Sequence, residues 1–135
     1  MPIVTWRDEY NVNVEEIDIQ HQKMLELVNT LHDAVETRVN KDGLKGLLIE
    51  LVEFTRLHFS TEEQLMKKYD YPDLASHHTE HRLLLRYLVD LVHIVSSGKN
   101  LSFYSDYDVS TDWALIHIIE HDKSLGAFLN SKDVY

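Results

Sequence analysis

The sequence predicts an all-α protein, an up-down-up-down antiparallel four-helix bundle with an ordered N-terminal arm. Four separate segments show helical periodicity, and in the first three the recurring residues are three and four positions apart. The chain contains only 4 Gly and 2 Pro, too few turn residues for a many-stranded sandwich or barrel. Its 135 residues suit a single domain that buries roughly two thirds of the surface of the unfolded chain.

Residues 1–16 are expected to form the arm, and several of their side chains are available to pack on a bundle: Trp6, Tyr10, Val12 and Val14. The first helix is expected over about 18–39, with Asp18 near its start. One face of this helix carries His21, Met24, Val28, Leu31 and Val35. Because the steps alternate between three and four, these side chains stay on one side of the helix.

The second helix is expected over about 41–67, with Asp42 near its start. Its recurring face consists of Leu44, Leu47, Leu51, Phe54, His58, Glu62 and Leu65. The third helix is expected over about 72–97, because Pro72 is favoured in a first turn. Its recurring face consists of Leu74, His77, His81, Leu84, Leu88, Leu91 and Val95.

The fourth helix is expected over about 110–129, after a long loop that ends near Val109. Its recurring face includes Trp113, His117 and Leu125. The other connections are short, which favours antiparallel neighbours, and sustained three-four spacing is typical of bundles with shallow crossing angles. We therefore expect one bundle over residues 1–135.

Composition excludes several function classes. The formal charge of −10 argues against binding a nucleic-acid backbone or an anionic membrane surface. The absence of cysteine excludes disulfides, thiolate metal sites and cysteine nucleophiles. No stretch approaches the roughly 18 apolar residues of a membrane span, so no membrane insertion is expected. No targeting segment is visible at the N-terminus, and the expected location is the cytoplasm.

Polar residues occupy helix faces where Leu or Val would be expected: His21, His58, Glu62, His77, His81 and His117. A buried charge or unpaired polar group costs several kcal/mol, so such a set needs a shared partner. Imidazole and carboxylate together form a typical metal-ligand set. His58 and Glu62 are four residues apart, as are His77 and His81, which makes each pair neighbours on its helix. These residues therefore indicate a metal site inside the bundle.

On the fourth helix, periodicity leaves the ligand open. His121 is four residues after His117 and would share its face on a regular helix. Asp122 is five residues after His117, and regular geometry turns it well away. The spacing alone does not decide between the two residues.

The quoted residues occur in a longer pattern: Trp6, Tyr10, Ile17-Asp18-Ile19-Gln20-His21, His58-Phe59-Ser60-Thr61-Glu62-Glu63, Tyr71-Pro72, His77-x-x-x-His81 and Trp113-x-x-x-His117-Ile118-x-x-x-Asp122-Lys123. This pattern resembles the hemerythrins over almost the whole chain, and most closely the single-domain bacterial members, the bacteriohemerythrins. All seven ligand positions of that family hold the matching residue type.

The resemblance implies a non-haem centre of two Fe ions (Fe2+/Fe3+) with an oxo or hydroxo bridge and O2 as ligand. His77, His81 and His117 would hold one iron, His21 and His58 the other, and Glu62 and Asp122 would bridge them. The family pattern selects Asp122 over His121, so we expect a wide turn or π-bulge near 117–122. It also implies that the O2 pocket is lined by Phe59, Trp113 and Ile118.

The implied function is reversible O2 binding, for oxygen carriage, storage or delivery, with no catalytic residue and no enzymatic activity. The alternatives are O2 or redox sensing through a partner, and a di-iron oxidase or peroxidase. Ferritin-like di-iron enzymes use Glu-x-x-His, and no Glu in this sequence has His three residues later. The expected partners are O2 and an unknown protein recipient of it, with no nucleic acid, and the expected state is a monomer.

Overall fold

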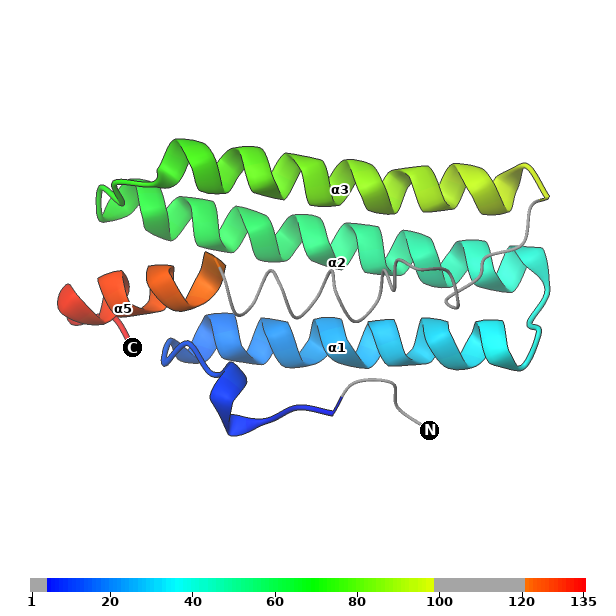
Figure 1. Cartoon of the computed structure of the whole chain (residues 1–135), viewed down its shortest axis with the longest axis horizontal. Helices are drawn as coiled ribbons and strands as arrows, with labels where there is room; N and C mark the ends of the chain where they lie inside the picture. Colours follow the sequence, from blue (N-terminus) through cyan, green and yellow to red (C-terminus); the bar gives the residue numbers. More distant parts are fainter. Residues whose placement is uncertain (1–4, 99–120) are drawn as a thin grey trace.

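The chain folds as an all-α, antiparallel four-helix bundle in the computed structural model, which describes residues 5–98 and 121–135 (Figure 1). A single 3-10 turn, η1 (Asp8–Tyr10), lies in the N-terminal arm. The bundle helices are α1 (Glu15–Glu36), α2 (Lys41–Lys68), α3 (Leu74–Ser96) and α5 (Lys123–Ser131). Neighbouring helices alternate in direction, which confirms the predicted fold class. None of the helices within the described ranges is both long and apolar enough to cross a membrane.

Local sequence explains where the helices begin. Asn40 caps α2, because its side chain accepts a hydrogen bond of 2.8 Å from the backbone N–H of Gly43. α1 begins at Glu15, earlier than expected, and Asp18 lies in its first turn. The Asp18 carboxylate accepts hydrogen bonds from the backbone N–H groups of Val12 (2.7 Å) and Asn13 (3.2 Å). Asp18 therefore fastens the arm to the first turn of α1.

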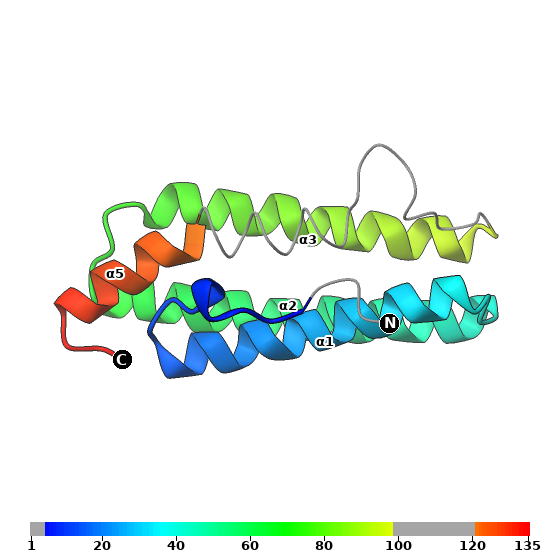
Figure 2. The same cartoon turned by 60° about the horizontal axis from the view of Figure 1, so that its bottom comes forward.

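The arm packs against the bundle, as expected. Its residues Tyr10, Val12 and Val14 are buried, and the Trp6 and Tyr10 rings meet edge to face at 5.7 Å. Figure 2 shows the arm passing in front of α1 toward the start of the bundle. Gly126 of α5 lies so close to this arm that an added Cβ would be 2.2 Å from the carbonyl oxygen of Val12. A glycine at this position therefore permits the arm to contact α5.

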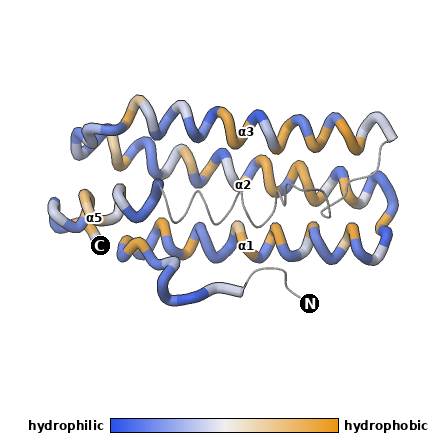
Figure 3. Tube along the Cα trace, viewed as in Figure 1, coloured by the Kyte–Doolittle hydropathy of each residue, from blue (hydrophilic) through white to orange (hydrophobic). Residues whose placement is uncertain are grey.

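Two groups of buried apolar side chains form the core. The larger contains Met24, Leu25, Leu27, Val28, Leu31, Leu48, Leu51, Val52, Phe59, Leu88, Leu91 and Val95. The smaller group joins the arm to the start of α1, the end of α2 and α5. It contains Val12, Val14, Ile17, Met66, Tyr71, Leu125 and Leu129. Along each of α1, α2 and α3, polar residues with apolar neighbours on both sides separate the two groups, and the hydrophilic and hydrophobic colours alternate there in Figure 3. The fold thus places a polar layer inside an apolar bundle.

Candidate metal centre

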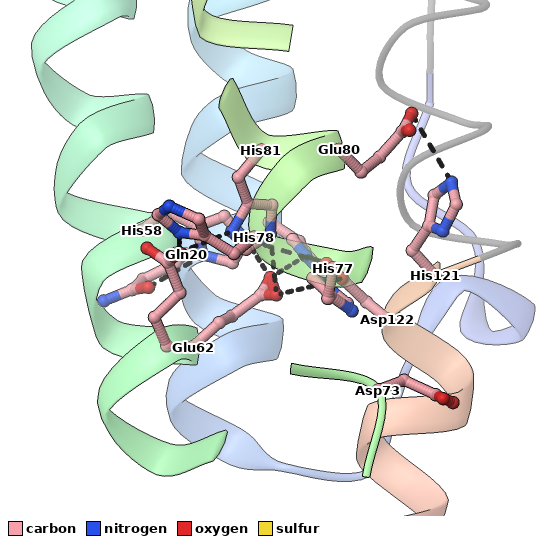
Figure 4. A network of polar contacts seen from close by, with 12 residues as sticks. Gln20, His58, Glu62, Asp73, His77, His78, Glu80, His81, His121 and Asp122 are labelled. Atoms are coloured by element: carbon pink, nitrogen blue, oxygen red, sulfur yellow. Dashed lines mark hydrogen bonds and ion pairs between the residues drawn. The ribbon is translucent and has the colours of Figure 1, made fainter. Parts of the chain in front are cut away.

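Six of the predicted ligand residues come together in the polar layer and form what we call the buried cluster: His21 of α1, His58 and Glu62 of α2, His77 and His81 of α3, and Asp122 next to α5. Their exposed fractions are 0% for four of them, 1% for His81 and 4% for His77. Figure 4 shows the side chains of five of them converging from separate parts of the chain: His58, Glu62, His77, His81 and Asp122. The described side chains of the cluster are therefore shielded from bulk water, as a buried metal centre requires.

Glu62 divides its two carboxylate oxygens between two groups of imidazoles. Its Oε1 lies 2.7 Å from Nε2 of His58 and 3.9 Å from Nε2 of His21. Its Oε2 lies 3.3 Å from Nε2 of His77 and 3.6 Å from Nε2 of His81. One carboxylate thus faces His21 and His58 with one oxygen and His77 and His81 with the other.

Asp122 repeats this division from the other side. Its Oδ2 lies 2.5 Å from Nε2 of His21 and 3.7 Å from Nε2 of His58. Its Oδ1 lies 3.1 Å from Nε2 of His77. Both carboxylates therefore lie between the same two imidazole groups, and the four imidazoles present their Nε2 atoms toward them.

The donor atoms fall into two overlapping sets, each with all its ligand atoms within 4.8 Å of one another. One set contains His21 and His58, the other contains His77 and His81, and both contain Glu62 and Asp122. Neutral imidazole and carboxylate are suitable ligands for divalent iron, zinc or manganese. The residues therefore fit a pair of metal ions that share two carboxylates.

His121 and Asp122 differ although they are consecutive. Asp122 is fully buried, whereas the His121 side chain is 31% exposed and its Nε2 lies 3.6 Å from Oε1 of Glu80 (Figure 4). Residues 121 and 122 are π-helical, in agreement with the expected wide turn. A π turn closes between residues i and i+5, so it changes which side chain of this segment faces inward.

The remaining expected ligand, His117, and two expected pocket residues, Trp113 and Ile118, lie outside the described residues. Phe59 is 1% exposed, and its ring stacks on His81 with centroids 3.8 Å apart and planes 6° apart. It also lies beside His58, at 5.7 Å between centroids. An apolar ring therefore borders the buried cluster on the side of α2 and α3.

Comparison with known proteins identifies the family. The family description "Hemerythrin HHE cation binding domain" matches residues 12–126. The chain belongs to the hemerythrin family. It is 32% identical to a bacteriohemerythrin of Methylococcus capsulatus over 97% of this chain and 100% of that protein. It is 29% identical to a bacteriohemerythrin of Stenotrophomonas maltophilia over 76% of this chain, and the match spans 66% of that relative's length.

Solved structures support the same family. The crystal structure of a wild-type hemerythrin superposes with a TM-score of 0.82 and 32% sequence identity, covering 94% of this chain and 98% of that one. The resemblance stated from the motifs is therefore confirmed. A hemerythrin domain is described as cation-binding, which agrees with the donor set of the buried cluster.

The carboxylates change the protonation of the hemerythrin cluster when no metal is bound. Burial alone lowers the pKa of His21, but hydrogen bonds and charge attraction from Asp122 and Glu62 outweigh it and raise the pKa from 6.5 to about 8. Burial likewise opposes protonation of His77, and the same two carboxylates raise its pKa to about 9. A metal ion would replace these protons, because only deprotonated imidazole is a ligand.

Two features beside the cluster were not predicted from the sequence. A cleft of about 240 Å³ opens at His77, and its walls include Tyr71, Asp73, Glu80 and His121. Gln20 reaches across from α1, and its Oε1 lies 2.8 Å from Nδ1 of His58. Gln20 directly precedes His21 in the motif, and this position was the available signal. It was missed because the prediction considered only residues on the inward faces of the helices.

Proposed function

We propose that this hemerythrin binds O2 reversibly at a non-haem di-iron centre and serves in oxygen carriage, storage or delivery. The observation that carries the proposal is that Glu62 and Asp122 each divide their two oxygens between the same two groups of imidazoles. That arrangement suits two metal ions bridged by two carboxylates. The bacteriohemerythrin relatives add support over nearly the full chain.

We assign His77, His81 and His117 to one iron and His21 and His58 to the other, with Glu62 and Asp122 as bridging ligands. When bound, the two irons would supply the redox chemistry that reversible O2 binding requires, together with an oxo or hydroxo bridge. Five imidazoles are neutral ligands, so the two carboxylates together with the oxo or hydroxo bridge would leave the site with little net charge. A low net charge limits the cost of holding the irons in a dry interior.

The chain's own contribution is to keep the site away from bulk water. The six residues of the buried cluster are at most 4% exposed. Phe59 places a ring against His81, and we propose that Phe59, Trp113 and Ile118 line the O2 pocket. An apolar pocket would keep water, the usual source of protons, away from the bound O2 and so would favour its release as O2.

We infer that the protein acts as a monomer in the cytoplasm, with a protein recipient of O2 as its partner and no enzymatic turnover. The acidic charge of −10 is unfavourable for nucleic acid and for an anionic membrane, so neither is proposed as a partner. Sensing through a partner and a di-iron oxidase or peroxidase activity are the competing functions, and the experiment below distinguishes the oxidase from the carrier.

The test is an anaerobic iron titration followed by cycles of argon, air and argon. We expect two irons per chain, and visible absorption that appears in air and fades again under argon. Irreversible bleaching with turnover of a reducing substrate would indicate an oxidase and would contradict the carrier function. A protein that takes up no iron would refute the proposed centre, and Asp122→Asn provides a matched variant that should lose part of the iron.

A further inference from the structure

His58 uses both ring nitrogens, and they face different groups. Its Nε2 points into the buried cluster, 2.7 Å from Oε1 of Glu62. Its Nδ1 points toward α1, where Oε1 of Gln20 lies at 2.8 Å (Figure 4). An imidazole can bind a metal through Nε2 only if that nitrogen carries no proton, so the position of the ring proton decides whether His58 is available as a ligand.

The Gln20 amide is held in turn by Thr61. Nε2 of Gln20 donates a hydrogen bond of 3.1 Å to Oγ1 of Thr61. The Thr61 hydroxyl donates its own hydrogen bond of 3.1 Å to the backbone carbonyl of Leu57. Leu57 directly precedes His58 in α2, so the contacts form a loop that leaves α2, passes through α1 and returns to α2.

These hydrogen bonds have a fixed direction. A hydroxyl has one proton, and Thr61 donates it to the Leu57 carbonyl, so the Thr61 oxygen is left to accept from Gln20. Gln20 must then present its NH2 group to Thr61 and its carbonyl oxygen to His58. A carbonyl oxygen can only accept, so the nearby Nδ1 of His58 must carry a proton.

We propose that Gln20 and Thr61 are positioning residues that hold the ring proton of His58 at Nδ1 and so keep Nε2 available to a metal ion. This inference rests on the proposed function, because it assumes that His58 is a ligand. It goes further by assigning a role to two side chains that do not belong to the donor set and by tracing that role to a backbone carbonyl of α2.

The opposite orientation of the Gln20 amide has a distinct consequence. If the amide turned over, its NH2 group would face Nδ1 of His58 and would require a lone pair there. The ring proton would then move to Nε2, next to Glu62, and would have to be removed before a metal could bind. Thr61 disfavours this orientation, because its hydroxyl would have to donate to the turned amide and would lose its hydrogen bond to the Leu57 carbonyl.

Four variants test the proposal. Gln20→Met removes the acceptor, and Thr61→Val removes the hydroxyl while it keeps the shape of the side chain. Thr61→Ser keeps the hydroxyl and removes only the methyl group. Gln20→Glu supplies a side chain that can only accept, so the amide orientation no longer matters. Gln64→Met is the matched control, because Gln64 makes an exposed hydrogen bond to Ser60 on the same helix, away from the cluster.

The first measurement is the tautomer of His58 in the metal-free protein, read from the 15N chemical shifts of its ring at a pH high enough for the ring to be neutral, because Glu62 can accept a hydrogen bond from Nε2 of the charged ring. We expect Nδ1 to be protonated in the wild type, in Thr61→Ser and in Gln64→Met. Thr61→Val should move part of the population to the Nε2 tautomer. A wild-type protein with the proton on Nε2 and a bare Nδ1 would overturn the proposal.

The second measurement is Co2+ affinity, followed by visible absorption. Gln20→Met should weaken binding by about 10- to 100-fold, the usual effect of losing a hydrogen-bond partner of a metal-bound histidine. Thr61→Val should weaken binding several-fold on its own and have no effect in the Gln20→Glu background. Thermal unfolding of each metal-free variant checks that the bundle is intact.

The outcomes separate this inference from the proposed function. If the wild type binds no Co2+ and no iron, the metal centre itself is refuted. If the wild type binds both but Gln20→Met and Thr61→Val bind as tightly as Gln64→Met, only the positioning role is refuted. An equal loss in Thr61→Val and Thr61→Ser would also refute it, because the serine retains the hydroxyl.

Discussion

His121 and Asp122 are neighbours in the sequence, yet they lie on opposite sides of the boundary between the buried cluster and the surface. Oδ2 of Asp122 is 2.5 Å from Nε2 of His21, inside the bundle. Nε2 of His121 is 3.6 Å from Oε1 of Glu80, and both residues line the cleft beside His77. Residues 121 and 122 are π-helical, and such a turn changes which side chains of the segment face inward.

Substitution of each of these two residues should therefore affect the iron content differently. Asp122→Asn removes one shared carboxylate charge, and we expect it to lower the iron content below two per chain. His121→Ala should leave the iron content unchanged, because this imidazole faces Glu80. Iron analysis after anaerobic loading measures both. Loss of iron in His121→Ala with retention in Asp122→Asn would reverse the assignment.

The metal-free protein should lose stability as the pH rises. The folded-state pKa values of His21 and His77 are raised from 6.5 to about 8 and about 9. A raised pKa stabilises the folded state fully below pH 6.5, and the stabilisation disappears as pH increases through the folded values. Urea unfolding at about pH 6 and about pH 10 should show a decrease of up to about 5 kcal/mol, since a change of one in pKa corresponds to about 1.4 kcal/mol.

Two controls make this pH prediction specific. His77→Gln should flatten the pH dependence, whereas His93→Gln should not, since His93 is exposed on the same helix. Bound metal should reverse the sign, because protons compete with the metal for the imidazoles. A metal-free protein that becomes more stable between these pH values would contradict the prediction.

Two glycines allow a test of the contact between the arm and α5. A Cβ at Gly126 would lie 2.2 Å from the carbonyl oxygen of Val12, so Gly126→Ala must displace the arm. We expect it to lower the free energy of unfolding by about 1–3 kcal/mol, the usual cost of overpacking. Gly46→Ala should instead stabilise by roughly 0.5–1 kcal/mol, because it favours the helix and an added methyl there meets nothing within 4 Å. Equal effects in urea unfolding would argue against the close packing.

Phe59→Leu tests the apolar border of the site. The Phe59 ring stacks on His81, and a smaller side chain leaves space that water can enter. We expect normal iron content but a shorter lifetime of the O2-loaded protein, followed by the decay of its visible absorption. Phe54→Leu is the control, since Phe54 packs against the larger core group. An unchanged lifetime in Phe59→Leu would remove Phe59 from the proposed pocket.

The sequence alone predicted the helical class and most of the donor set, because both depend on local periodicity. A three-four repeat fixes which side chains of one helix share a face, so His58 with Glu62 and His77 with His81 could be paired without coordinates. Polar residues on otherwise apolar faces then indicated a metal, because a core that buries polar groups without a shared partner is unstable.

Contacts between helices were decided only by the tertiary structure. The division of the Glu62 and Asp122 oxygens, and the reach of Gln20 to His58, depend on how far each helix slides and rotates against the next. A repeat within one helix contains no information about that register. The choice of Asp122 over His121 depends on a local change of helical pitch, which the regular period used to interpret the sequence assumes to be absent.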